Sequence, residues 1–152
     1  MQRYDRFSSK YGDYIRESVF DASKDILSSH VQEQIIFLIY AIMIYEDYNR
    51  PKIMRIAEWV LKVTLFRCRT MSLGIMQVQT KQLIFDKGSI GLAIPRIIEP
   101  FLSDQNSPIY TAISRYNSSC EYEIEVNAIY NILTEQIPCD QEAPTNNDSY
   151  RI

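Results

Sequence analysis

The distribution of apolar and polar positions predicts a chain of helices packed around one buried helix. Residues 35–45 form an almost uninterrupted apolar run, Ile-Ile-Phe-Leu-Ile-Tyr-Ala-Ile-Met-Ile-Tyr, which is followed by Glu46. A helix with almost no polar side is typical of the interior of a domain. We therefore expect residues 31–46 to form a buried central helix. The run of 11 residues is too short to span a bilayer.

Amphipathic segments on both sides of this run predict the other helices. Asn49 as N-cap, with Pro51 in the first turn, marks the start of a helix over residues 49–66, whose broad apolar stripe we expect to face the core. Gly74 predicts a turn, and residues 86–89 predict a second break in the chain. The expected helices cover residues 14–27, 31–46, 49–66, 77–85, 90–102, 107–116 and 121–136.

Length and composition indicate a single all-α domain. The chain has 152 residues, of which 46% are hydrophobic, so it can bury about two thirds of its unfolded surface. We find no internal repeat and no second domain within residues 1–137. Residues 138–152 are mostly polar and are expected to form a disordered tail.

The charge balance makes nucleic acid an unexpected partner. The net charge is −3 and the sequence pI is near 5.2, so the chain as a whole does not attract polyanions. Residues 50–69 are the exception, because six basic residues occur there with a single acid, Glu58. An ordinary salt-bridged helix face explains this spacing, and a basic rim that attracts an anionic polymer is the alternative.

Cysteine and histidine usage argues against metal and nucleophilic sites. Cys68, Cys120 and Cys139 are widely spaced and form no Cys-x-x-Cys pair, so we expect no zinc site and consider Cys120 to Cys139 the only disulfide worth testing. The single histidine, His30, precedes the apolar helix and is expected to be exposed or to cap it. A catalytic triad is therefore not expected.

The start of the chain predicts no export signal. Residues 1–6 are mostly polar and lead into no apolar segment, so we expect no secretory signal peptide. Together with the short apolar run, this predicts a chain that is synthesised in the cytoplasm and carries no transmembrane segment.

Glu46 is the main candidate for chemistry. A carboxyl group at the end of an apolar helix lies at the edge of the core, where loss of solvation disfavours the carboxylate and raises the pKa. The negative end of the helix dipole acts in the same direction. A carboxyl group that stays protonated near neutral pH is suited to protonate a leaving group, although a surface glutamate at a helix end is the alternative interpretation.

Two later segments add to this candidate. The first is Gly74-Ile75-Met76-Gln77 and the second is Tyr116-Asn117. Taken alone, the first is a turn followed by two core residues, and the second is a helix end with asparagine as C-cap.

Together with Glu46, and in this order, these segments resemble the lysozyme-like superfamily and, within it, the lytic transglycosylases and goose-type lysozymes. In that family the catalytic glutamate ends a buried helix, a Gly-Leu-Met-Gln segment lines the cleft, and a Tyr-Asn segment closes its other side. The resemblance covers roughly residues 31–133. It implies a lysozyme-like helical domain that cleaves the glycan strands of peptidoglycan, with no metal and no cofactor.

The resemblance also implies roles for individual residues. Glu46 is expected to be the general acid and base, and the expected substrate-binding residues are Gly74, Ile75, Met76, Gln77, Tyr116 and Asn117. Three positions differ from the family pattern: Ile75 replaces leucine, Asp47 stands where serine is usual, and Ser119 stands where glycine is usual.

The family resemblance also predicts the reaction. Glycosidases with two catalytic carboxyls hold them at set separations, but Asp47, Glu58 and Asp86, the only candidates for a second one, belong to no motif of their own. In lytic transglycosylases one glutamate acts first as acid and then as base, and the substrate's N-acetyl group assists. The expected product is a 1,6-anhydro-muropeptide.

Three alternatives remain open at this point. The chain could be a non-catalytic lysozyme-like module that binds glycan or protein, as the changes at Asp47 and Ser119 would suit. The Glu46-Asp47 pair is reminiscent of peptidoglycan glycosyltransferases, which share the fold. An all-helical interaction domain would use the 11 tyrosines and residues 50–69 as its surface. For a cell-wall enzyme we expect action in the periplasm or wall after delivery outside the general secretory route, by a lysis system, a secretion apparatus or an envelope complex.

Overall fold

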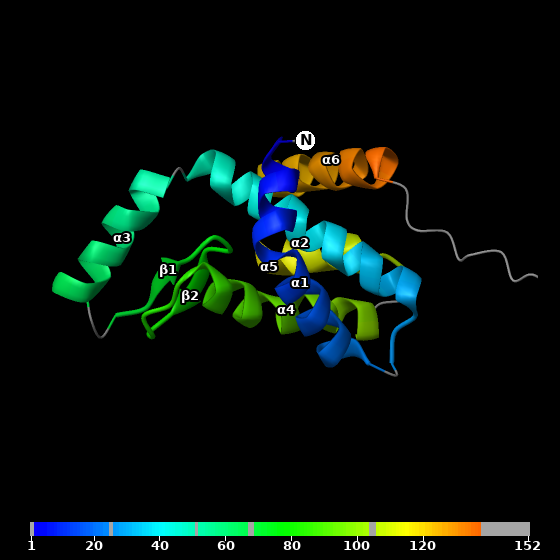
Figure 1. Ribbon diagram of the computed structural model, residues 1–152, viewed down its shortest axis with the longest axis horizontal. Helices are drawn as coiled ribbons and strands as arrows, with labels where there is room; N and C mark the ends of the chain where they lie inside the picture. Colours follow the sequence, from blue (N-terminus) through cyan, green and yellow to red (C-terminus); the bar gives the residue numbers. More distant parts are fainter. Residues whose placement is uncertain (1, 25, 51, 67–68, 104–105, 138–152) are drawn as a thin grey trace, which may run out of the picture.

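The computed structural model describes residues 2–24, 26–50, 52–66, 69–103 and 106–137. These residues form an all-α fold with one small antiparallel hairpin, as the sequence predicts (Figure 1). The elements in chain order are α1 (Gln2–Ser23), α2 (Ser29–Asn49), α3 (Lys52–Thr64), β1 (Met71–Leu73), β2 (Val78–Thr80), α4 (Asp86–Ser103), α5 (Pro108–Tyr116) and α6 (Cys120–Gln136).

Helix α2 is the buried centre of the molecule, and helices α1, α4 and α6 pack around it (Figure 1). All residues from Ile35 to Met43 are buried, which explains why this helix shows no amphipathic pattern. Ser28 caps the helix by accepting a hydrogen bond of 3.4 Å from the backbone nitrogen of Val31. The helix continues past Glu46 to Asn49, so Asn49 is its last residue and not the N-cap of the next helix.

Two helices begin earlier than the sequence predicts. Helix α1 starts at Gln2 and not near Tyr14, because Phe7 and Tyr11 belong to the same buried stripe as Ile15 and Val19. Residues 86–89, which were expected to break the chain, form the first turn of α4: the Ser89 hydroxyl donates to the carbonyl of Asp86 at 2.7 Å.

The helix expected over residues 77–85 is absent, and a hairpin lies there instead. Strand β1 pairs with β2 with Leu73 opposite Val78, both buried. Residues 74–77 connect the strands, and both Gly74 and Gln77 have positive φ angles, of 74° and 48°. Left-handed backbone at these two positions cannot continue into a helix, so the chain reverses at this turn.

Helix α3 has the opposite orientation to the one its pattern predicts. The apolar stripe expected to face the core is turned to solvent, with exposed fractions of 73% for Ile53 and 63% for Ile56. The inward side carries Arg55, Glu58 and Lys62 instead, and Lys62 is the buried residue of this helix. Pairing of these charged groups with the body of the molecule therefore decides which face turns inward.

Within the described ranges no helix has the length and apolarity needed to cross a membrane. The expected tail over residues 138–152, and Cys68 and Cys139, lie outside the described residues. Cys120 is exposed as a free thiol, and His30 is exposed in the first turn of α2.

Candidate active site

A cavity of about 820 Å³ lies where the C-terminal part of α2, the hairpin and the α5–α6 connection meet. Its lining is mostly polar and aromatic. The lining residues are Tyr45, Glu46, Asn49, Arg50, Thr70, Ser72, Gln77, Val78, Gln79, Arg96, Ser114, Arg115, Tyr116, Asn117, Ser118, Ser119 and Tyr122. Residues from four separate parts of the chain thus share one concave surface, as is typical of small-molecule and polymer sites.

Glu46 is the only acidic residue in this lining, and it is nearly buried, with 9% of its surface exposed. Burial raises the pKa of its carboxyl group to about 7. Arg50 and Tyr122 act to lower the pKa, and the nearby charge of Glu58 acts to raise it. The net result is a carboxyl group that is about half protonated at neutral pH, so it can both give and accept a proton.

Three tyrosine rings form the wall beside Glu46. The rings of Tyr45 and Tyr122 meet edge to face with centroids 4.7 Å apart, and those of Tyr116 and Tyr122 stack at 6.3 Å. The Tyr122 hydroxyl is buried beside the Glu46 carboxyl, and its interaction with that carboxyl lowers the pKa of Glu46. Tyr122 therefore belongs to the immediate surroundings of the candidate acid.

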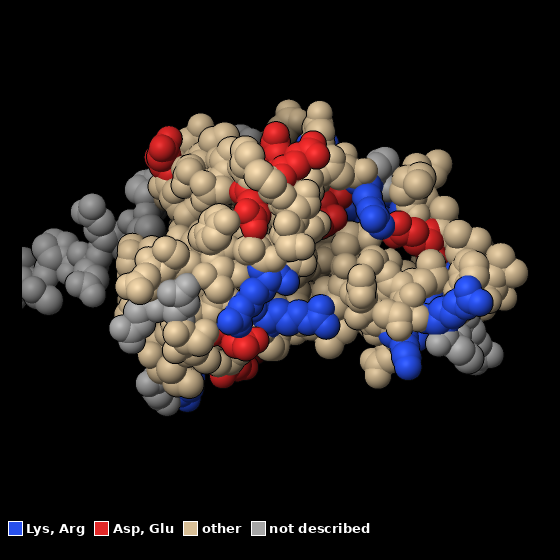
Figure 2. Space-filling view, turned by 180° about the vertical axis from the view of Figure 1, so that it is seen from behind, with Lys and Arg blue, Asp and Glu red and all other residues tan. Residues whose placement is uncertain are grey.

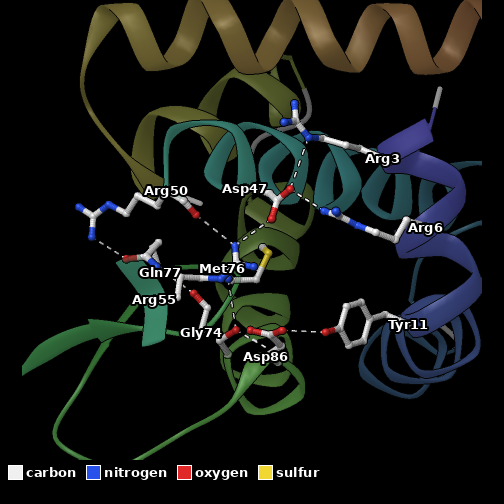
Figure 3. A network of polar contacts seen from close by, with 11 residues as sticks. Arg3, Arg6, Tyr11, Asp47, Arg50, Arg55, Gly74, Met76, Gln77 and Asp86 are labelled. Atoms are coloured by element: carbon white, nitrogen blue, oxygen red, sulfur yellow. Dashed lines mark hydrogen bonds and ion pairs between the residues drawn. The ribbon is translucent and has the colours of Figure 1, made fainter. Parts of the chain in front are cut away.

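Gln77, the last residue of the turn between the strands, lines the cavity together with Ser72 and Val78, and Figure 3 shows its contacts with Gly74 and Arg50. Gln77 is held on both sides: its Nε2 donates to the Gly74 carbonyl at 2.9 Å, and its Oε1 accepts from Arg50 Nη1 at 2.8 Å. The Tyr116 hydroxyl donates to the Met76 carbonyl and so joins the turn to the end of α5. These bonds fix the side chains of Gln77 and Tyr116 at the cavity before any ligand arrives.

Gly74 is required for this turn. Besides its positive φ, a β-carbon at this position would lie 2.4 Å from Cβ of Ser89. Ser89 is itself buried and needed there, because its hydroxyl accepts a hydrogen bond of 3.2 Å from the backbone nitrogen of Met76.

The structure brings four of the seven expected site residues to the cavity and leaves three out. Glu46, Gln77, Tyr116 and Asn117 line it. Ile75 and Met76 have side chains buried in the core, and Gly74 lines a neighbouring cavity of about 430 Å³. Gly74, Ile75 and Met76 therefore do not line the main cavity, and they form the turn that places Gln77 there.

None of the three other carboxyl groups considered from the sequence lines the cavity. Asp47, although buried, contacts the guanidinium groups of Arg55 at 3.0 Å and of Arg3 at 3.4 Å, and also accepts from Arg6 (Figure 3). Burial acts to raise the pKa of Asp47, but the hydrogen bonds and charges of the arginines hold it below its usual range.

Asp86 and Glu58 are engaged elsewhere. Asp86 accepts a hydrogen bond of 2.8 Å from the Tyr11 hydroxyl and lines the smaller cavity. Glu58 pairs with Arg50 at 2.8 Å, and Arg50 is the residue of this pair that lines the main cavity. One carboxyl group, that of Glu46, therefore faces the main cavity within the described part of the chain.

Sequence reasoning missed four lining residues that bear on the chemistry. Tyr122 lies within the helix expected over residues 121–136, Arg50 lies within the basic segment over residues 50–69, and Arg96 and Arg115 belong to no motif. Arg115 also pairs with Glu99 at 3.2 Å. No local pattern marks these residues, because they meet Glu46 only through the packing of α2, α4, α5 and α6.

Comparison with models of known protein families, with curated proteins and with solved structures gives no match for this chain.

Proposed function

We propose that the chain cleaves the glycan strands of peptidoglycan at the β-1,4 bond between N-acetylmuramic acid and N-acetylglucosamine, as a lytic transglycosylase. The observation that carries this proposal is the position of Glu46, whose pKa burial raises to about 7, in a polar cavity where no other carboxyl group of the described residues lies. Glycosidic oxygens are poor leaving groups unless they are protonated, and Glu46 is suited to supply that proton.

Glu46 performs two steps in this proposal. It first protonates the glycosidic oxygen as the bond to the anomeric carbon breaks, while the N-acetyl group of the muramic acid stabilises the positive charge that develops. The resulting Glu46 carboxylate then takes the proton from the O6 hydroxyl as O6 bonds to the anomeric carbon. A carboxyl group with a pKa near the working pH performs both transfers without a second residue.

The rest of the lining suits an anionic sugar polymer. The side chains of Gln77 and Asn117 offer hydrogen-bonding groups to hydroxyl and N-acetyl substituents. Arg50, Arg96 and Arg115 offer positive charge to the carboxyl groups of the peptide stems. The aromatic wall gives flat apolar surface for the faces of sugar rings.

The geometry argues against polymerisation by a Glu-Asp pair. Asp47 is held by three arginines outside the cavity that contains Glu46, so the two adjacent carboxyls do not act on one substrate. The non-catalytic module stays an alternative, and the experiment below separates it from the enzyme.

Replacement of Glu46 by glutamine tests the proposal. Glu46→Gln keeps the shape and hydrogen-bonding capacity of the side chain but removes the transferable proton, so we expect cleavage of purified peptidoglycan to fall by about 10²- to 10⁴-fold or more. Release of soluble muropeptides is the measurement, and retained binding to insoluble peptidoglycan shows that the site still forms.

Glu33→Gln is the matched control, because Glu33 lies in the same helix outside the cavity. It should cleave at the rate of the parent chain. A Glu46→Gln variant that cleaves as fast as the parent would show that Glu46 is not the catalyst. A parent chain that binds peptidoglycan without releasing any product would support the non-catalytic module.

A further inference from the structure

Helix α3 presents an aliphatic surface to solvent on the side away from the body of the molecule. It stands at one end of the fold, with β1 as its main neighbour (Figure 1). Seven large apolar residues on or just after this helix are between 40% and 73% exposed: Ile53, Met54, Ile56, Val60, Leu61, Val63 and Leu65. We call these seven residues the α3 outer face. A contiguous apolar surface of this kind on a monomer is typical of an interaction site.

Polar contacts on the inner side fix the helix in this orientation. Arg55 binds the buried Asp47 at 3.0 Å, Glu58 binds Arg50 at 2.8 Å, and the buried Lys62 ammonium donates to the carbonyl of Arg69. Trp59 stacks on Phe85 with ring centroids 5.8 Å apart. Rolling the helix to bury the outer face would break all of these contacts and leave the buried charge of Asp47 with fewer partners, which is costly.

The part of the chain that carries α3 is strongly basic. Residues 50–85, here called the α3 lobe, contain seven lysines and arginines and one acid, a net charge of +6. Since the whole chain has a net charge of −3, the remainder carries −9. In Figure 2 blue side chains lie at the α3 end, on the right in that view, and a second blue group lies over the middle of the molecule. Among the described residues of the lobe, Arg50, Arg55, Glu58 and Lys62 are engaged in the inner contacts, whereas Lys52, Arg69 and Lys81 are exposed. The exposed charged groups that remain in the described part of the lobe are therefore positive.

The charge and chemistry of the lobe select among possible partners. A second copy of the chain on the same face would bring a second lobe with a net charge of +6 close to the first, and electrostatic repulsion disfavours such a dimer. A protein interface of ordinary composition needs about one hydrogen bond per 100–200 Å², and the seven side chains of the outer face offer none. The interior of a lipid bilayer forms no hydrogen bonds, so side chains without donors or acceptors can enter it. Anionic headgroups attract the exposed cations of the lobe.

We propose that the α3 outer face docks on the surface of a lipid bilayer that contains anionic phospholipid. The aliphatic side chains enter the boundary between headgroups and acyl chains, and exposed cations of the lobe, such as Lys52 and Lys81, bind among the headgroups. The helix lies on the membrane and does not cross it. This inference is independent of the cleavage reaction, since it rests on a surface outside the main cavity.

Sedimentation of the full chain with lipid vesicles tests the proposal. We expect binding to vesicles of phosphatidylglycerol mixed with phosphatidylcholine, and little binding to phosphatidylcholine alone. The triple variant Ile53→Gln, Ile56→Gln and Val60→Gln should bind at least about 100-fold more weakly. The double variant Lys52→Gln and Lys81→Gln should bind about 30-fold more weakly, and high salt should weaken the parent similarly.

Matched controls remove equal apolar surface and charge elsewhere. The triple variant Leu102→Gln, Ile124→Gln and Ile132→Gln changes exposed residues of α4 and α6. The double variant Lys10→Gln and Lys24→Gln changes two exposed lysines, one within α1 and one just after it. Both should bind vesicles as the parent does, and all variants should keep the helical circular dichroism of the parent.

Three results would overturn the proposal. The first is a parent chain that binds no phosphatidylglycerol vesicles. The second is equal loss of binding in the α3 and control variants. The third is a dimer in sedimentation equilibrium that the α3 triple variant dissociates, because the outer face would then be an interface between copies. Peptidoglycan cleavage is not a readout here, so failure of lipid binding and failure of the proposed reaction stay separate.

Discussion

Glu46 and Asp47 are adjacent acids in one helix, yet their surroundings move their pKa values in opposite directions. Both are nearly buried. Burial raises the pKa of Glu46 to about 7 because it outweighs the opposing charge of Arg50, whereas the pKa of Asp47 falls because the hydrogen bonds and charges of Arg6 and Arg55 outweigh its burial. Two carboxyl groups separated in this way are suited to different tasks, one to proton transfer and the other to holding structure.

The raised pKa of Glu46 predicts the pH dependence of cleavage. The proton-donating form predominates below pH 7, so kcat/KM should fall about tenfold per pH unit on the alkaline side of about pH 7. A pH profile of muropeptide release measures this limb.

Arg50→Gln tests directly whether the pKa of Glu46 sets this alkaline limb. Because the Arg50 charge lowers the pKa of Glu46, its removal should move the alkaline limb to higher pH, whatever it does to the maximal rate. A limb that stays in place, or moves to lower pH, would show that another group controls it.

Local patterns predicted the elements whose ends are set by nearby residues. The central helix follows from its apolar run, and α5 begins at Pro108 after Ser107, as the Ser-Pro pair predicts. The errors have non-local causes. The hairpin depends on a turn that packs on Ser89 of α4. The orientation of α3 depends on the ion pairs that the buried Asp47 carboxylate forms with Arg55 and with the arginines of α1.

The residues of the candidate site also fall into two groups, those that a local sequence pattern marks and those that only the packing of helices places there. The sequence pointed to Glu46, Gln77 and Tyr116 through three short segments, and these residues line one cavity. Tyr122 and Arg96 belong to no such segment, and only the packing of helices brings them to Glu46.

The turn between the strands is the element on which the site depends, and Gly74→Ala tests it. The added methyl group would clash with Ser89 at 2.4 Å, and alanine at a φ of 74° is strained in addition. We expect a loss of at least about 2 kcal/mol in the free energy of unfolding, measured in urea, together with reduced cleavage because Gln77 loses its position.

Gly12→Ala is the control for this change. A β-carbon at Gly12 meets its nearest atom, the Tyr40 hydroxyl, at 3.4 Å, and the position lies within helix α1. Its stability should stay within about 1 kcal/mol of the parent. Equal stability of the Gly74 and Gly12 variants would show that the turn tolerates a side chain and adds little to the site.

Over the whole chain, the net charge is unevenly distributed. The α3 lobe carries the net positive charge, and Arg50 belongs both to this lobe and to the lining of the main cavity. Positive charge therefore attracts a polyanionic ligand into the cavity. Positive charge of the neighbouring α3 lobe likewise attracts an anionic surface.

The products of cleavage provide the last test, and the prediction follows from the positions of the carboxyl groups in the described part of the chain. Hydrolysis with inversion needs a second carboxylate to activate water, and hydrolysis with retention by an enzyme nucleophile needs one on the other side of the anomeric carbon. Asp47 and Asp86 are bound to residues outside the main cavity, and Glu58 is bound to Arg50. The O6 hydroxyl of the same sugar is then the nucleophile already in place, and its reaction is favoured by proximity.

We therefore expect mass spectrometry to find muropeptides lighter by one water than those of a hydrolytic lysozyme. Cleavage in water enriched in oxygen-18 should leave the anomeric carbon unlabelled, whereas hydrolysis would place the label there. Labelled reducing ends as the main product would contradict the prediction and direct attention to Glu58, the remaining acid whose charge reaches Glu46. In that case Glu58→Gln should abolish the label-bearing product while Asp86→Asn leaves it, because Asp86 lines a different cavity.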